Sequence, residues 1–270
     1  MTTDAFSNGD KSISNGISNR DHSVSNGVSN GDQPKSISCG DDTLSLIKRI
    51  ERLEAMREIE NLLGRRMAYH SAGRHDLELE HLWSHRDDIC FEGEDWGAWE
   101  GYEAVKKSYV DSNPYPNGHP GMLVEHLCCT GVIEVAEDGQ TAKGTWISPG
   151  HETFPIEGYE LPQPHWNWGR YGIDFIKEAD GRWKIWHLHV ITTFRVPYHK
   201  DWVEVGLKRP EYFGPEGTLP DFIKVKPNRG VSFNAPYHPH RGPQMQPPPP
   251  EPYKTWRDTW SAVDYHEYKG

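Results

Sequence analysis

The chain has 270 residues, of which 35% are hydrophobic, and its net charge is −11. An acidic chain lacks the basic face that contacts with phosphates require, which argues against a nucleic-acid partner. No run of the sequence reaches the ~18 apolar residues of a membrane span, and no apolar segment of a signal peptide opens the chain. The sequence therefore predicts a cytoplasmic protein with no membrane contact.

The four cysteines, at positions 39, 90, 128 and 129, show no Cys-x-x-Cys spacing, so we expect reduced and mostly buried thiols. Aromatic residues are abundant, with 11 Trp, 12 Tyr and 8 Phe. They predict either a large pocket for a flat, apolar ligand or a large subunit interface.

Residues 1–42 repeat Ser-Asn-Gly, starting at Ser7, Ser14, Ser25 and Ser29. The few apolar groups of this segment cannot offset the entropy of ordering its backbone, about 1–2 kcal/mol per residue. We predict a disordered tail, unless a partner subunit orders it.

Apolar residues at helical spacing predict three helices in the first half of the chain. The first is long and runs from about 43 to 73, the second runs from 76 to 83 with Asp76 as its N-cap, and the third runs from 101 to 113.

Strand patterns dominate the following part of the chain. Two runs rich in aromatic and β-branched residues flank Asp180-Gly181, which is a strong signal for an antiparallel hairpin over 169–194. The other predicted strands are 89–92, 96–100, 123–135 and 141–148. Helices that precede long antiparallel strands indicate an α+β fold, and we predict that the long loop 149–164 covers a pocket.

Residues 201–270 contain Pro-rich runs, which rule out regular structure, yet they hold more aromatic residues than a disordered linker carries. We expect an extended arm that packs over its own domain or over a neighbouring subunit. The predicted assembly is a homodimer or homotrimer with this arm in the interface.

Six local patterns, in order along the chain, resemble the SnoaL-like branch of the nuclear transport factor 2-like superfamily. The matching segments are 57–63 with Tyr69, 76–78, 99–105, 126–135 with 138–142, 169–171 and 180–184. The resemblance covers residues 43–200 and implies a curved, antiparallel sheet that wraps the long helix as a cone, with a pocket at the open end. Enzymes of this branch include scytalone dehydratase, hexachlorocyclohexane dehydrochlorinase, polyketide cyclases, ketosteroid isomerases and lignin-dimer formaldehyde lyases. Most of them need no cofactor, and many other relatives are binding modules.

The resemblance implies that His126 is a catalytic base, since dehydratase-like members place a histidine at the start of this strand. An imidazole titrates near neutral pH and therefore suits proton transfer. The alternative is a core histidine bonded to backbone. Relatives orient the histidine with a carboxylate near the end of the first helix, where this chain has Gly73, or Ser71 or His70 if the helix end shifts. His126 would then pair with Tyr69, His70 or Asp174.

Asp174 lies in an apolar strand, where an unpaired carboxylate is costly to bury. Asp174 and Arg170 are four residues apart, an even number, so both point to the same face of the strand. They could form a structural ion pair or act as catalytic groups. The remaining candidates are residues able to line a substrate pocket or to hold an oxyanion. They are Trp96, Tyr109, Trp146, Trp166, Trp168, Tyr171, His187 and His189.

His187 and His189 lie two residues apart on a predicted strand and therefore point to one face. A proton relay, a metal site and surface histidines are all compatible with this spacing. We predict no metal, because no carboxylate accompanies the pair nearby in the sequence. The dinucleotide, P-loop and nucleophile-elbow motifs do not occur in the sequence, and we expect no cofactor.

The sequence favours a cofactor-independent lyase, of the dehydratase or formaldehyde-releasing type, that acts on a hydrophobic aromatic molecule through a histidine base. The alternatives are a polyketide or terpenoid cyclase or isomerase, and a non-catalytic ligand-binding or assembly module. A less favoured role is the small subunit of a ring-hydroxylating dioxygenase.

Overall fold

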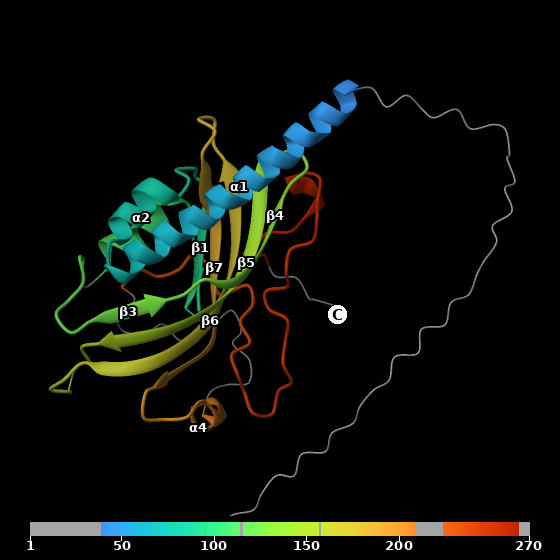
Figure 1. The fold of residues 1–270 in the computed structure, drawn as a ribbon. Helices are drawn as coiled ribbons and strands as arrows, with labels where there is room; N and C mark the ends of the chain where they lie inside the picture. Colours follow the sequence, from blue (N-terminus) through green and yellow to red (C-terminus); the bar gives the residue numbers. More distant parts are fainter. Residues whose placement is uncertain (1–38, 95, 114–115, 157, 209–223, 265–270) are drawn as a thin grey trace, which may run out of the picture. The chain divides into compact units, whose positions relative to one another are not determined.

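The computed structural model describes residues 39–94, 96–113, 116–156, 158–208 and 224–264. The chain divides into two compact units, Met1–Asp42 and Thr43–Gly270. The predicted disordered tail falls almost entirely outside the described residues. The second unit contains the sheet and all the residues that the sequence proposes for a site (Figure 1).

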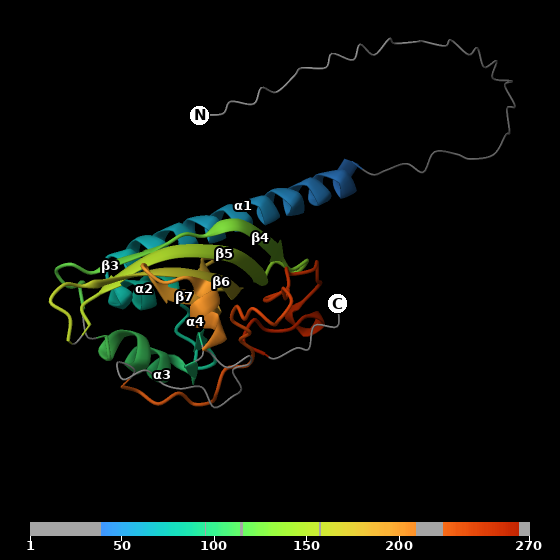
Figure 2. The same cartoon turned by 90° about the horizontal axis from the view of Figure 1, so that it is seen from below.

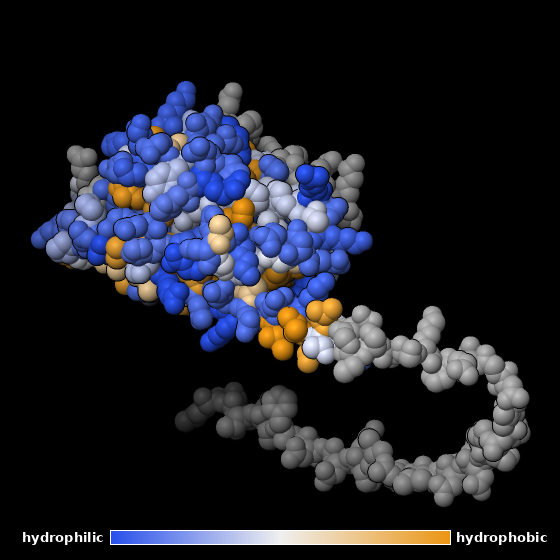
Figure 3. All heavy atoms as spheres, turned by 90° about the horizontal axis from the view of Figure 1, so that it is seen from above, coloured by the Kyte–Doolittle hydropathy of each residue, from blue (hydrophilic) through white to orange (hydrophobic). Residues whose placement is uncertain are grey.

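The long first helix, α1, spans Cys39–Ser71. Its C-terminal half buries one stripe of side chains at helical spacing, Ala55, Ile59, Leu62, Leu63 and Arg66. Its N-terminal half leaves apolar side chains exposed. These are Leu44, Leu46, Ile47, Ile50 and Leu53. Figure 3 shows orange, apolar atoms between the mostly blue, polar atoms of the surface.

The other helical elements are short. They are α2 (His75–Leu82), α3 (Tyr102–Lys106), the π-helical turn η1 (Lys107–Asp111), α4 (Trp202–Leu207) and the 3₁₀ turn η2 (Trp256–Asp258). The prediction that Asp76 is the N-cap of α2 is wrong. Arg74 takes the N-cap position without a side-chain cap, and its Nε lies 2.8 Å from Oδ1 of Asp76, so this carboxylate pairs with a cation instead. None of the described helices is long and apolar enough to cross a membrane.

The described strands form one curved sheet in the order β2-β1-β7-β6-β5-β3, with β4 also paired to β5. The strands are β1 (Cys90–Gly93), β2 (Gly97–Glu100), β3 (Leu123–His126), β4 (Cys129–Val135), β5 (Thr141–Phe154), β6 (Gln163–Lys177) and β7 (Trp183–Pro197). The α+β class is confirmed. Pairing is antiparallel except between β1 and β7, which run parallel and make the sheet mixed.

Two strand predictions need correction. The predicted strand over 123–135 is two strands, β3 and β4, and Thr130 has a positive φ of 46°, which interrupts regular pairing. Half of the predicted loop over 149–164 is strand, because β5 continues to Phe154 and pairs with β6 as far as Gln163.

The two faces of the sheet have different partners. The inner face, which α1 covers, carries Tyr171, Ile173 and Phe175 of β6, all in one hydrophobic core with the buried stripe of α1. The outer face carries the even-numbered neighbours, and there a Cβ placed on Gly172 would lie 3.3 Å from Cβ of Ala262. The C-terminal segment therefore packs on the outer face, as the orange and red ribbon in Figures 1 and 2 indicates.

A β-bulge in the last hairpin changes which side chains of β7 point to each face of the sheet. Asp174 pairs with His187 in the β6–β7 ladder, but Phe175 pairs with Ile185, so Trp186 is the extra residue. The bulge keeps Ile185 in the core while His187 points to the outer face. His187 and His189 thus share a face, as their spacing predicts.

Candidate functional site on the inner face

A buried histidine–carboxylate pair lies on the inner face, where β3 and β5 run side by side. Nε2 of His126 lies 3.1 Å from Oε1 of Glu152. The same carboxylate accepts a hydrogen bond of 2.8 Å from Nδ2 of Asn167 on β6. It also forms an ion pair with Arg195 on β7, whose Nε lies 2.7 Å from Oε2. Four strands thus contribute one residue each to a connected polar group at this end of the sheet.

The ionisation of Glu152 fixes the tautomer of His126. Burial would raise the pKa of Glu152, but Arg195, His126 and Asn167 together lower it to about 2. An ionised carboxylate only accepts hydrogen bonds, so Nε2 of His126 must carry the proton. Nδ1 then holds the free electron pair, and in the described part of the chain no residue donates to it. His126 is thus arranged to accept a proton at Nδ1.

Gly150 allows this histidine to lie against β5. It pairs with His126 in the β3–β5 ladder, and a Cβ at this glycine would sit 2.5 Å from Nδ1 of His126. Any larger residue would displace the imidazole. The position of this imidazole therefore requires a glycine at 150.

A second polar cluster lies deeper, between α1, α2 and η1. Nε of Arg66 lies 2.9 Å from Oε1 of Glu78, and both side chains are almost fully buried. Tyr109 donates to Oε2 of Glu78 across 2.9 Å, and the Trp83 indole donates to Oε1 across 3.3 Å. Burial and the neighbouring Glu78 raise the pKa of Tyr109 well above its usual value, so this phenol stays protonated at neutral pH.

Two histidines connect this deeper cluster to His126. Nδ1 of His70 lies 3.1 Å from Nε2 of His75 and 3.3 Å from the Tyr109 hydroxyl, while the rings of His70 and His126 are 5.4 Å apart between centroids. Burial, followed by the nearby cations, lowers the pKa of His70 well below its usual value, and burial also lowers that of His75. Both imidazoles are therefore neutral at pH 7 and able to relay or donate hydrogen bonds.

The inner face thus brings together four of the sequence-predicted residues, His126, His70, Tyr109 and Tyr171, with Trp146 in the same core. Tyr69 packs partly buried against this core, and Trp96 does so from the β1–β2 side. The sequence reasoning missed Glu152, Glu78, Arg66 and His75. Glu152 was not predicted as a site residue because its segment was predicted to be a loop, whereas it forms the end of β5.

The structure places the other predicted residues on the outer face, away from His126. Asp174 is fully buried between Lys143, whose Nζ lies 2.8 Å from Oδ1, and His187, whose Nδ1 lies 2.9 Å from Oδ2. Burial would raise the pKa of Asp174, but Lys143 and His187 hold it well below its usual range. The expected convergence of Asp174 and His126 therefore does not occur, because side chains alternate between the faces of β6.

The outer-face residues bind the C-terminal segment. Oγ of Ser261 and the backbone N–H of Ala262 both donate to Oδ2 of Asp174 across 2.8 Å, and Nδ1 of His189 lies 2.9 Å from the carbonyl oxygen of Ala262. Arg170 donates to the carbonyl oxygen of Gln246 across 3.2 Å. Trp166 and Trp168 are exposed on this face and stack on Tyr198 and Phe194.

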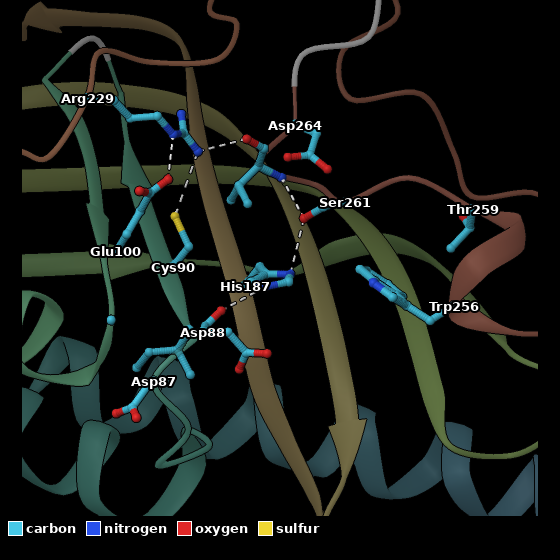
Figure 4. Close-up of a pocket in the computed structure, with 13 residues that line it drawn as sticks. Asp87, Asp88, Cys90, Glu100, His187, Arg229, Trp256, Thr259, Ser261 and Asp264 are labelled. Atoms are coloured by element: carbon cyan, nitrogen blue, oxygen red, sulfur yellow. Dashed lines mark hydrogen bonds and ion pairs between the residues drawn. The ribbon is translucent and has the colours of Figure 1, made fainter.

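A cavity of about 480 Å³ lies between this segment and the sheet edge (Figure 4). Its lining is polar, with Asp88, Glu100, His187, Arg229 and Ser261 among the contributing residues. Ser261 and Asp174 both contact Nδ1 of His187, whose Nε2 faces the Asp88 carbonyl oxygen across 3.1 Å. A nucleophilic triad needs the serine and the carboxylate on different ring nitrogens, so this group is an anchor and not a triad.

No group of three His, Cys, Asp or Glu side chains that could hold a metal ion occurs among the residues that the structure describes. His187 and His189 each pair with a separate buried carboxylate, Asp174 and Glu92 respectively. Their shared face thus serves to attach the C-terminal segment.

The family model for the SnoaL-like domain matches residues 51–189, slightly more than half of the chain. The chain belongs to the SnoaL-like family. The matched range of this SnoaL-like protein includes α2, β1–β6 and the first half of β7, and therefore His126, Glu152, Asn167, Arg66 and Glu78. Arg195 and the C-terminal segment lie beyond it.

Several solved structures are similar to this chain at low sequence identity. A hexachlorocyclohexane dehydrochlorinase from Novosphingobium barchaimii LL02 is 17% identical with a TM-score of 0.45, and the match covers 57% of this chain and 96% of that one. A scytalone dehydratase-like protein from Novosphingobium aromaticivorans is 18% identical with a TM-score of 0.44, over 56% and 91% of the two chains. A nuclear transport factor 2-like protein from Salmonella enterica is 14% identical with a TM-score of 0.44, over 55% and 98%. No curated protein sequence matches this SnoaL-like chain.

Proposed function

We propose that this SnoaL-like protein is a cofactor-independent lyase that removes a proton from a carbon atom of a hydrophobic, aromatic small molecule. The observation that carries the proposal is the buried His126–Glu152 pair, whose geometry leaves Nδ1 of the imidazole as the proton acceptor. A positioned general base of this kind accelerates proton transfer about 10²- to 10⁴-fold.

In a dehydration, the lost water comes from a hydroxyl group on the carbon next to the one that loses its proton. The C–H bond breaks and its proton moves to Nδ1 of His126, while the electron pair of that bond forms a C=C bond as the neighbouring C–O bond breaks. The departing hydroxide takes the proton back from His126 and leaves as water, which restores the base. Glu152 keeps the ring oriented and stabilises the imidazolium that exists between the two transfers.

The nature of the substrate is supported by the composition of the inner face. Aromatic and aliphatic side chains surround the polar groups, among them Trp146, Tyr171 and Phe91. Neutral donors also lie in this core: the ring of the uncharged His70 is 5.4 Å from that of His126, and Tyr109 and the uncharged His75 contact His70. An apolar ring with a few oxygen substituents matches such a wall better than a highly charged molecule.

The test is turnover of a panel of lignin-type dimers and polyketide precursors by the purified full chain, without added cofactor and with mass-spectrometric detection. We expect loss of water or of formaldehyde from at least one compound, and a 10²-fold or greater loss of rate in His126→Gln. His199→Gln, at an exposed histidine, is the matched control and should keep full activity. A chelator control separates any metal-dependent activity.

Equal rates for His126→Gln and the wild type would refute the proposed base. Tight binding of a panel compound without turnover would instead support a ligand-binding module. An isomer of unchanged mass as the product would identify an isomerase rather than a lyase.

A further inference from the structure

The N-terminal half of α1 carries apolar side chains that the rest of the described chain does not cover. Residues 43–54 are all exposed except the half-buried Arg52, and the first buried residue of the helix is Ala55. Leu46, Ile50 and Leu53 are 53%, 46% and 66% exposed. In Figures 1 and 2 the N-terminal end of α1 extends past the strands of the sheet. An apolar surface of this kind indicates contact with another molecule.

Leu46, Ile50 and Leu53 form an apolar seam along one side of α1. Their spacing of four and then three residues matches a coiled-coil heptad, with both leucines at position d and the isoleucine at position a. At about 100° per residue, the seam lies roughly 160° around the helix from the buried stripe that starts at Ala55. A second helix can therefore lie along the apolar seam without displacing the sheet that α1 covers.

Two unpaired charges flank the apolar seam. In the same heptad register Arg49 occupies position g and Glu54 occupies position e. Neither side chain makes a hydrogen bond or an ion pair with a residue that the structure describes, whereas Arg52, between them in the sequence, pairs with Glu134. Both charges are therefore available to a partner.

The signs of these charges favour a parallel pair of identical helices. In a parallel coiled coil, position g of one helix faces position e in the next heptad of the other, so Arg49 of each copy lies opposite Glu54 of the other. In an antiparallel pair g faces g and e faces e, so the two residues do not meet. Ile at position a with Leu at position d also favours two parallel strands. The helix is thus complementary to a second copy of itself in the parallel orientation.

The short length of the apolar seam is offset by the rest of α1. An isolated helix of about 12 residues is marginal in water, because its nucleation is unfavourable. The buried stripe from Ala55 to Leu63 holds the following turns of α1 in the core, so the turns that carry the seam extend a helix that is already nucleated. Pairing therefore orders few additional groups, and we expect a dissociation constant on the order of 1–100 µM.

We propose that the apolar seam binds a second copy of this chain, with the two α1 helices parallel and Arg49 of each opposite Glu54 of the other. This dimer contact lies on α1, whereas the sequence predicted the C-terminal arm for the subunit interface. The proposal does not depend on the proposed function, because the seam contains none of the residues around His126.

The association is measured by sedimentation velocity of the full chain at about 1–100 µM, where we expect a monomer–dimer equilibrium. Leu46→Glu brings two carboxylates together in the seam and should raise the Kd of the dimer at least about 30-fold. Leu44→Glu is the matched control, since it makes the same substitution at a leucine of the same helix that is 61% exposed and outside the seam. It should leave the Kd unchanged, and circular dichroism should report the same helix content for both variants.

Charge reversals test the orientation of the two helices. Arg49→Glu places like charges opposite Glu54 and should weaken the dimer about 3- to 10-fold, and Glu54→Arg should weaken it by a similar factor. The double variant Arg49→Glu/Glu54→Arg should restore the wild-type Kd, because the pair is inverted rather than lost. Lys48→Glu changes the net charge equally at an exposed position outside the seam and should not weaken the dimer.

A monomer over the whole concentration range, or a dimer that Leu46→Glu leaves intact, would overturn the proposal. If another surface also joins the chains, Leu46→Glu should halve the mass of the assembly and Leu44→Glu should leave it whole, and equal masses would count against the seam. Failure of the double charge reversal to restore association would refute the parallel orientation.

Discussion

The imidazole of His126 and the carboxylate of Glu152 are joined by a 3.1 Å contact between Nε2 and Oε1, although 26 residues separate them in the sequence. The contact exists because β3 and β5 pair antiparallel, with His126 opposite Gly150 and Val124 opposite Glu152. The direction of this hydrogen bond decides which ring nitrogen accepts a proton, and the first two predictions depend on it.

Glu152→Gln should lower kcat about 10- to 100-fold with little change in KM, because the amide still fills the space but no longer fixes the tautomer or stabilises the imidazolium. Steady-state kinetics on the substrate found in the panel measures this. Glu125→Gln is the control, since it makes the same substitution one residue away on β3 at an exposed position. Equal losses in the two variants would show that Glu152 has no particular role.

Gly150→Ala should lower activity about 100-fold, because the new methyl group would sit 2.5 Å from Nδ1 of His126 and force the ring to move. Circular dichroism should report a retained fold. Gly64→Ala is the matched control: a Cβ there meets nothing within 4 Å on the exposed side of α1, so we expect full activity and a stability gain of about 0.5–1 kcal/mol. Full activity of Gly150→Ala would argue against the assigned position of the base.

The wild type should lose stability steeply below about pH 4. In the folded state Asp174 has a pKa held well below the unfolded value of about 3.9, and Glu152 has one of about 2. Each depressed pKa contributes stability that is complete above the unfolded pKa and is lost as the pH falls through the folded one. Chemical denaturation at a series of pH values measures this slope.

Asp174→Asn should cost about 3–5 kcal/mol at neutral pH, because Lys143 would remain buried without its counter-ion. The variant should also show a shallower loss of stability in acid than the wild type. Glu160→Gln, at an exposed carboxylate, is the control and should follow the wild-type curve. An unchanged acid slope in Asp174→Asn would refute the assignment.

Arg229→Ala should detach the C-terminal segment from the outer face. Its guanidinium pairs with Glu92 at 3.0 Å and with Glu100 at 2.7 Å, and also donates to the carbonyl oxygen of Val263 at 2.9 Å. Without these contacts, limited proteolysis should cleave the segment faster while the sheet remains intact. Arg257→Ala removes an exposed arginine from the same segment and should digest at the wild-type rate. Equal rates for the two variants would show that Arg229 does not anchor the segment.

Local patterns were sufficient to predict that helices precede the sheet, but not α4 or the division of 123–135 into β3 and β4. Helical spacing located α1 and α2, Asp180-Gly181 located the last hairpin, and the two-residue spacing of His187 and His189 placed both on one face. Such features depend on residues close together in the chain, which the periodicity of helices and strands relates directly. The place of His126 does not belong to this class, since it was expected at the start of a strand and is the last residue of β3.

Only the tertiary structure decided which of these residues meet. The sequence offered Asp174 as a partner for His126 and did not point to Glu152, whereas strand register places Glu152 on the face of His126 and Asp174 on the opposite one. Register depends on pairings between distant segments, and a shift of one residue inverts every side chain of a strand. For the same reason the pairing of Arg66 with Glu78, and the contact of Ser261 with Asp174, follow from the packing of helices and of the C-terminal segment rather than from any local pattern.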